Sequence, residues 1–200
     1  MLSETGQATA PATPLRVVVG PTVPLARALA PVAVLSRAAP EVGVAVERSA
    51  DAEWRVAAAR ADVALVRGPV HSPTLVWAVA SREPRVALVV AAHPLARAGH
   101  AKVSDLAGVE ILEPSDDALG LGQRIGAVEE LLTRVAAGRA VAVVPRDLST
   151  GIPEPLVAVP LPNAIPSTIV VAQRTEPGAG AATQAYVDAV LHRNGHGGRP

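Results

Sequence analysis

Short apolar segments alternate with helix-length segments in the first third of the chain, and this alternation is the strongest constraint on the fold. Three segments rich in Val, Ala and Leu have the length of buried strands, namely residues 15–19, 42–47 and 61–66. The segments between them are predicted to be helices: residues 23–38, with Thr22 as the capping residue and Pro24 in the first turn, and residues 52–60. Strands connected by helices in this way form a parallel sheet that helices cover, so the sequence predicts an α/β fold.

The pattern changes after residue 70, where strands follow one another more often. We expect strands at residues 76–81, 85–91, 110–112, 140–144, 156–159 and 169–172, and helices at residues 127–137 and 184–192. Gly138 is predicted to end the first of these helices. The segment 113–126, acidic and then rich in glycine, is predicted to be a loop. Residues 1–14 and 194–200 are predicted to be disordered tails.

The core must be built almost without aromatic side chains. The chain has no Phe, one Tyr and two Trp, so Ala, Val and Leu are expected to fill the interior, and the stability is expected to be modest for the size. It also has no Cys, which excludes disulfides, thiolate catalysis and zinc sites built from Cys.

Charge and hydropathy narrow the class of protein further. Eighteen basic residues balance eighteen acidic ones, without a Lys/Arg cluster, so we expect no direct binding to nucleic acid. The N-terminal segment lacks the features of a signal peptide, and the longest apolar runs are far too short to span a membrane, which takes about 20 residues. We therefore expect a cytoplasmic protein that does not interact with membranes.

Six segments follow one another in an order that is typical of one family. They are residues 15–17, 61–69, 86–96, 103–108, 131–145 and 156–161. Among them, residues 93–96 read His-Pro-Leu-Ala, residues 105–108 read Asp-Leu-Ala-Gly, and residues 135–145 are similar to the motif V-A-A-G-x-G-V-x-x-x-P. In this order and spacing the chain, from residue 15 to about residue 193, resembles the effector-binding domain of LysR-type transcriptional regulators.

The resemblance implies a periplasmic-binding-protein-like fold with two lobes and an effector cleft between them. Lobe I is expected to comprise residues 15–90 and 166–193, and lobe II residues 91–165, with two crossing strands near residues 90 and 165. Two positions depart from the family pattern. Ala140 replaces the second glycine of the motif, and the stretch between Leu112 and Val135 leaves room for little more than one helix, so the second lobe is expected to be shortened. The winged helix-turn-helix of a full regulator is also missing from the sequence, so we expect a stand-alone or truncated effector-binding domain.

The resemblance also implies which residues line the cleft. Carried over from the family, these are Pro21, Thr22, Gly68, Pro69, Ala91, Ala92, Pro145 and Arg146. The hydroxyl and nearby amides of Thr22 are suited to a carboxylate, and Arg67 or Arg146 would complete a charge-assisted clamp. His71 is a further candidate, as a polar contact or general base. The alternative is that Thr22 only caps a helix while both arginines and His71 lie at the surface.

Other polar and aromatic residues suggest no chemistry of their own. The glycines of residues 120–126 do not have the spacing or the preceding strand of a dinucleotide-binding motif, and a flexible loop is expected there. Asp116 and Asp117 are adjacent and are expected to be solvated, and no His spacing indicates a metal site. Trp77 is expected to pack beneath the crossing strands, and Trp54 either in the core or at an interface.

The sequence therefore predicts a small-molecule effector-binding domain of the LysR type, with a carboxylate as a candidate effector. It is expected to act in transcription regulation through a partner or as a stand-alone ligand binder, and to form a homodimer or pair with another regulator. No cofactor, metal site or catalytic residue is predicted. The alternatives are an enzyme on the same two-lobed fold, such as a dehydratase, isomerase or cyclase, and a decayed domain that serves only dimer contact.

Overall fold

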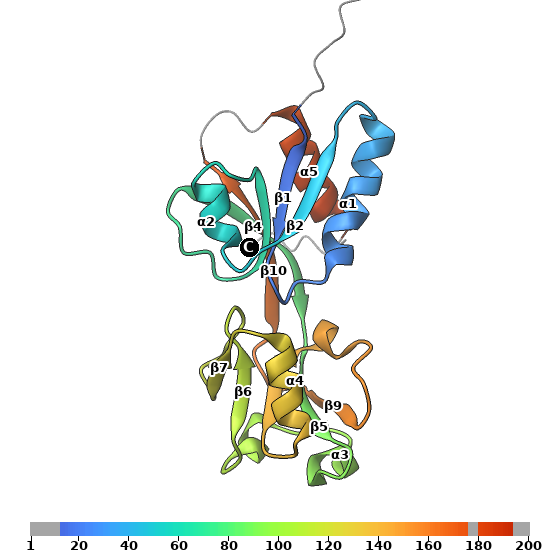
Figure 1. The fold of residues 1–200 in the computed structure, drawn as a ribbon, viewed down its shortest axis with the longest axis vertical. Helices are drawn as coiled ribbons and strands as arrows, with labels where there is room; N and C mark the ends of the chain where they lie inside the picture. Colours follow the sequence, from blue (N-terminus) through green and yellow to red (C-terminus); the bar gives the residue numbers. More distant parts are fainter. Residues whose placement is uncertain (1–12, 176–179, 194–200) are drawn as a thin grey trace, which may run out of the picture.

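The chain folds into two lobes that lie end to end and are joined by a narrow neck (Figure 1). The computed structural model describes residues 13–175 and 180–193. Lobe I contains a five-stranded sheet in the order β2-β1-β3-β10-β4, and lobe II a five-stranded sheet in the order β7-β6-β8-β5-β9. The predicted two-lobed α/β fold is confirmed.

The sheet of lobe I begins as the parallel sheet that the sequence predicts. β1 (Leu15–Val19) pairs in parallel with both β2 (Val44–Arg48) and β3 (Val63–Arg67). β10 (Ser167–Arg174) returns from lobe II and runs antiparallel between β3 and β4 (Leu75–Glu83), so that β4 forms the edge of the sheet. The strands β1 and β3 are almost wholly buried because helices cover both faces.

Three helices cover this sheet. α1 (Leu25–Ala38) and α5 (Ala181–Arg193) pack against one face, and α2 (Ala52–Ala57) lies on the other (Figure 1). The first helix begins after Pro24, whose ring fixes a backbone angle suited to a helix start, and no side chain caps it. The predicted capping role of Thr22 is therefore wrong.

In the sheet of lobe II four strands run in the same direction and one, β5, runs opposite to them. β6 (Ile111–Pro114) pairs in parallel with β7 (Gln123–Ile125) and β8 (Val141–Pro145), while β5 (Arg85–Val90) runs antiparallel to β8 and β9 (Leu156–Leu161). α4 (Val128–Ala136) covers one face, and α3 (Pro94–Ala98) and the 3-10 helix η1 (Val103–Leu106) lie against the other. A second 3-10 helix, η2 (Arg146–Ser149), follows β8. Gly138 ends α4 with a φ of +71°, as predicted.

The chain crosses between the lobes at Pro84 and Pro166. The first crossing lies earlier than the predicted residue 90, because β5 pairs with the strands of lobe II from its first residue, Arg85. The return crossing lies where it was expected, just before β10 begins at Ser167. Lobe I thus comprises residues 13–83, 167–175 and 180–193, and lobe II comprises residues 85–165.

The stretch after β6 is compact rather than loose. The glycine-rich segment predicted to be a flexible loop contains β7, which adds a strand to the edge of the sheet. No helix lies in residues 115–122, between β6 and β7, and the sheet of lobe II has five strands like that of lobe I, so the expected shortening of the second lobe stays a prediction.

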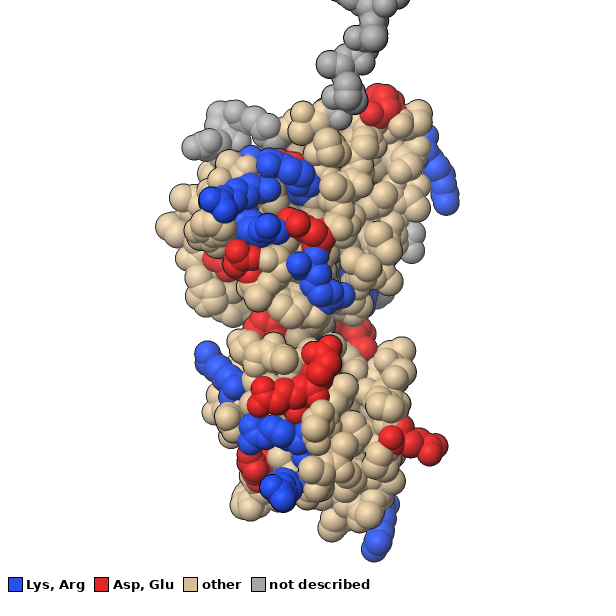
Figure 2. Space-filling view, in the orientation of Figure 1, with Lys and Arg blue, Asp and Glu red and all other residues tan. Residues whose placement is uncertain are grey.

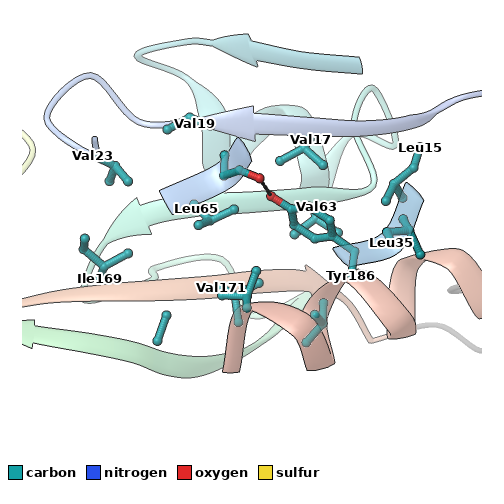
Figure 3. Close-up of a cluster of buried hydrophobic side chains, with 14 residues drawn as sticks. Leu15, Val17, Val19, Val23, Leu35, Val63, Leu65, Ile169, Val171 and Tyr186 are labelled. Carbon is teal, nitrogen blue, oxygen red and sulfur yellow. Dashed lines mark hydrogen bonds between the residues drawn. The ribbon is translucent and has the colours of Figure 1, made fainter. Parts of the chain in front are cut away.

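Tyr186 is the one aromatic side chain in the described core of lobe I. It is fully buried among Val, Leu and Ile side chains, and its hydroxyl donates a hydrogen bond of 2.9 Å to the carbonyl of Ala28 in α1 (Figure 3). Burial raises the pKa of the Tyr186 hydroxyl, which remains protonated at all ordinary pH values. The remaining core consists of small aliphatic residues, as the composition predicts.

None of the helices in residues 13–175 and 180–193 combines the length and the apolar character that crossing a bilayer requires.

Tyr186 is predicted to stabilise lobe I through its ring more than through its hydroxyl. We expect Tyr186→Phe to lower the free energy of unfolding by about 1 kcal/mol, because it removes one hydrogen bond. Tyr186→Ala is expected to cost about 3–5 kcal/mol, because it also leaves a cavity. Urea denaturation followed by circular dichroism measures both, with Gln184→Ala, at an exposed position of the same helix, as the control. Equal losses for the two variants would contradict the prediction.

Candidate functional site

A cavity of about 400 Å³ lies between the two lobes beside the neck. Lobe I contributes the loop after β1, the start of α2 and the residues that follow β3, and lobe II contributes residues 115–118 and Arg124. Figure 2 shows the waist between the lobes, where acidic side chains gather. The cavity lies at the carboxyl ends of β1 and β3, which is where open α/β sheets bind their ligands.

Thr22, in the loop after β1, directs two donors at a carboxylate of lobe II. Its backbone amide and its hydroxyl lie 3.2 Å and 2.7 Å from the same oxygen, Oδ2 of Asp116. Thr22 itself is almost completely buried, whereas Asp116 is half-buried and lines the cavity. The carboxylate that these donors hold belongs to the chain itself, and the binding of an effector carboxylate by Thr22 stays a prediction.

Two arginines hold the carbonyl groups of this loop. Arg48, at the end of β2, donates from Nη1 to the carbonyls of Gly20, at 3.2 Å, Val23, at 3.1 Å, and Pro21. Arg67, at the end of β3, donates from Nη2 to the carbonyl of Thr22 at 3.0 Å. Because these carbonyls are turned toward the guanidinium groups, the amide and hydroxyl of Thr22 are left to bind an anion.

Arg67 also begins a buried network that runs through the neck. Its Nη1 donates to Oε2 of Glu83 at 2.9 Å and to Oγ of Ser167 at 2.8 Å. The Ser167 hydroxyl donates to Oδ1 of Asp117 at 2.9 Å, and Arg85 donates to both oxygens of Asp117 at 2.8 Å and 2.9 Å. The network joins both crossing strands to a loop of lobe II, so it fixes the neck.

These contacts correct two expectations. Asp117 was expected to be solvated, but only 5% of its surface is exposed, because it pairs with Arg85 inside the neck. Arg67 lines the cavity, but its charge is already paired with Glu83. The predicted clamp on an effector is therefore replaced, for Arg67, by a supporting contact to the loop that holds Thr22.

The two buried carboxyl groups of the neck, those of Asp117 and Glu83, have raised pKa values. Burial raises the pKa of Asp117 above its ordinary value, and the guanidinium groups of Arg85 and Arg67 oppose this rise. The pKa of Glu83 is also raised, first by burial and then by the neighbouring carboxyl group of Asp147. For both acids, the nearby guanidinium groups favour the charged form and so act against the effect of burial.

A second contact between the lobes lies beside the first. Arg27 of α1 donates from Nη2 to Oε1 of Glu83 at 2.9 Å and to Oδ2 of Asp147, in η2 of lobe II, at 3.5 Å. Lobe II thus approaches lobe I with the carboxylates of Asp116 and Asp147, and lobe I meets them with hydrogen-bond donors.

The loop that carries Asp116 is shaped by a buried glutamate. Glu113 is fully buried and accepts hydrogen bonds from the amides of Leu119, Leu121 and Gly122 at 2.6, 2.8 and 3.1 Å. Gly122 passes so close to β6 that a Cβ atom there would lie 2.1 Å from the carbonyl oxygen of Ile111, so only glycine fits. Residues 115–122 are therefore a tightly held turn, and the expectation of a flexible loop is wrong.

The structure places the predicted site residues in three groups. Pro21, Arg67, Gly68, Pro69 and His71 line the cavity, and Thr22 contacts it through Asp116. Pro145 and Arg146 lie beside the neck, where the Arg146 amide donates to the carbonyl of Pro84, but they do not line the cavity. Ala91 and Ala92 lie at the far end of lobe II, because β5 begins at the neck with Arg85 and runs away from it. For these last two residues the prediction is wrong.

His71 is exposed at the rim of the cavity and stands beside Glu53. Glu53 accepts a hydrogen bond of 2.8 Å from the His71 amide, and the ring nitrogen Nδ1 lies 3.7 Å from its other oxygen. A role of His71 as a polar contact for a ligand stays a prediction. Within residues 13–175 and 180–193, no group of three or more His, Asp or Glu side chains is placed to hold a metal ion.

Both tryptophans are half-exposed, so neither packs in the core. Trp77 lies on the edge strand β4 with 49% of its surface exposed, beside a second hollow that Val79 and Ile165 also line. Trp54 is 50% exposed and carries the guanidinium of Arg60 over its ring at 4.7 Å. The expected packing of Trp77 beneath the crossing strands is wrong.

The sequence is similar to one family over more than half of its length. Residues 8–125 match the family model described as the LysR substrate binding domain. No curated protein sequence matches the chain.

The fold is similar to that of solved regulatory domains. A mutant OxyR regulatory domain from Pseudomonas aeruginosa has a TM-score of 0.75 and 18% identity, over 90% of this chain and 97% of that chain. The reduced form of OxyR has a TM-score of 0.75 and 20% identity, over 90% of this chain and 95% of that chain. The BenM effector binding domain, solved with its effector benzoate, has a TM-score of 0.72 and 20% identity, over 90% of each chain. Identities this low establish the fold alone.

Asp117 is predicted to be the most sensitive single position of the neck. We expect Asp117→Ala to lower the free energy of unfolding by about 3–5 kcal/mol, because it leaves the buried Arg85 without its partner. Chemical denaturation measures this loss. The matched control is Asp147→Ala, which removes a longer and more exposed ion pair and is expected to cost less than about 1 kcal/mol. Similar losses at both positions would contradict the prediction.

Proposed function

The chain belongs to the LysR substrate-binding domain family, and we propose that it binds a small-molecule effector in the cavity between its lobes. The observation that carries the proposal is the position of this cavity: it lies at the ends of β1 and β3, beside the donors of Thr22, and both lobes line it. A ligand that contacts both lobes would favour one arrangement of the lobes over the others, and such a shift in conformational population is how a domain of this kind would act in regulation. Nothing among the described residues favours an enzyme on the same fold.

We propose a carboxylate as the effector. Support for the proposal comes from the donors of Thr22, which hold the carboxylate of Asp116, and from two arginines that lie behind the loop. Arg124 also lines the cavity and offers a cationic side chain from lobe II. The similar BenM domain binds benzoate, an aromatic carboxylate, as its effector. Val66 and Pro69 provide an apolar wall on which the rest of such a ligand would lie.

We further propose that the domain acts on transcription through pairing, either with a second copy or with another regulator. Support comes from α1, which exposes the apolar side chains of Leu25, Leu29 and Val34 to between 38% and 47%, with Leu25 and Leu29 one turn apart on the same face. An apolar face of this kind is typical of a surface that another chain covers.

The first prediction of the proposal concerns stabilisation by benzoate and other small carboxylates. A ligand present at about 100 times its dissociation constant would raise the free energy of unfolding by about 2.7 kcal/mol and the melting temperature by several degrees. Thr22→Ala is expected to abolish this rise, because it removes the hydroxyl donor of the site. Thermal denaturation with and without ligand measures the effect.

Arg146→Ala provides the control, since Arg146 is exposed and does not line the cavity. It should retain the full rise in melting temperature. A rise that survives Thr22→Ala, or that disappears with Arg146→Ala, would place the ligand outside the proposed site.

The second prediction concerns pairing through α1. Leu29→Glu places a charge next to Leu25 on the exposed side of α1 and is expected to increase the dissociation constant of a dimer at least tenfold. Sedimentation equilibrium measures this change. Arg37→Glu, near the end of the same helix, serves as a charge control. A wild-type chain that is monomeric at high micromolar concentration would refute pairing between two copies.

A further inference from the structure

The carboxylate of Asp116, in lobe II, already accepts hydrogen bonds from the donors that the proposed effector would need. We infer that the amide and hydroxyl of Thr22 form a carboxylate subsite whose resident occupant is Asp116, and that a carboxylate effector binds by displacing it. Asp116 therefore determines which ligands the cavity accepts. This inference rests on the proposed function, because it assumes that the effector enters the cavity between the lobes.

The contact has the geometry of a bound ligand rather than of a packing contact. Both donors of Thr22 converge on one oxygen, Oδ2, at 3.2 Å and 2.7 Å. The two residues are 94 positions apart in the sequence and belong to different lobes. Arg48 holds the carbonyls of Pro21 and Val23 on either side of Thr22, and Arg67 holds the carbonyl of Thr22 itself, so the donors remain oriented when the occupant leaves. A free carboxylate would find the same arrangement.

Asp116 is free to leave without disturbing the neck. Its neighbour Asp117 points to Arg85 and Ser167 and is buried, whereas Asp116 is half-buried at the cavity wall. The turn that carries both residues is held separately by Glu113. Rotation of the Asp116 side chain therefore breaks one contact between the lobes and leaves the buried network in place.

A ligand must bind Thr22 strongly enough to displace the Asp116 carboxylate. An intramolecular group competes like a ligand at an effective concentration in the millimolar range. A carboxylate that offered nothing else would compete poorly, and one that also contacts Arg124 or the apolar wall near Val66 would succeed. Removing the resident carboxylate should therefore increase the affinity for simple carboxylates by at least tenfold. Binding would at the same time replace a direct contact between the lobes, leaving Arg27 and Asp147 as the remaining one beside the neck.

The test is chemical rescue of Asp116→Ala with formate. The ¹⁵N-labelled variant is titrated with sodium formate, with sodium chloride at equal ionic strength as the reference, and the Thr22 amide resonance is followed. We expect formate to return this resonance toward its wild-type position, with a dissociation constant at least tenfold lower than in the wild-type protein. The double variant Thr22→Ala and Asp116→Ala should give no response in neighbouring amides. Asp147→Ala, which removes the other carboxylate that meets lobe I, should behave as the wild type.

The outcomes separate this inference from the proposed function. If formate binds the variant no better than the wild type, Asp116 is not an occupant of the subsite, even if benzoate still stabilises the wild type through Thr22. If formate rescues the variant while benzoate binds neither protein, the subsite is real and benzoate is not an effector of this domain. Asp116→Asn keeps an acceptor oxygen for Thr22 and should give an intermediate affinity, which provides a second variant should the alanine protein fail to fold. Tighter binding of methylammonium to the wild type than to Asp116→Ala, without formate rescue, would overturn the inference in favour of a cationic ligand.

Discussion

The buried pair of Arg85 and Asp117 is the interaction on which the arrangement of the two lobes depends. Charges withdrawn from water are costly unless each finds a partner of matching geometry. Here both oxygens of Asp117 are bound by one guanidinium, and Ser167 links the pair to Arg67 and Glu83. The network includes the first residue of β5 and the first residue of β10. It therefore joins the two strands that connect the lobes at the neck, where the molecule is narrowest.

The same network also prepares the cavity beside it. Arg67 contacts Glu83 on one side and the carbonyl of Thr22 on the other, so the rigidity of the neck is passed to the loop that offers hydrogen-bond donors. Arg48 completes this support from the neighbouring strand. The lobes then meet with complementary chemistry, since lobe II contributes carboxylates and lobe I contributes donors. The donors of Thr22 are thereby held in place, which would preorganise them for the carboxylate that we propose as the effector.

The fold could be predicted from the sequence more fully than the site could. Buried strands such as β3 and β8 show themselves as apolar runs, and Gly138 marks the end of α4, because these signals are local. The strand β7 carries no such signal, since it exists only by pairing with β6. Asp116 and Asp117 look alike in the sequence, yet one lines the cavity and the other is buried, because their partners lie in distant segments. Arg48 was missed for the same reason.

The position of the two indole rings has a practical consequence for spectroscopy. Trp54 and Trp77 are both about half-exposed, whereas the aromatic residue of the lobe I core, Tyr186, is a phenol. Fluorescence excited at long ultraviolet wavelengths will thus come from indole rings that water already reaches in the native protein. The wavelength of its emission maximum will therefore change little when the chain unfolds. The emission of Trp77 will instead respond to whatever approaches the edge strand β4, which makes it a reporter of surface events rather than of folding.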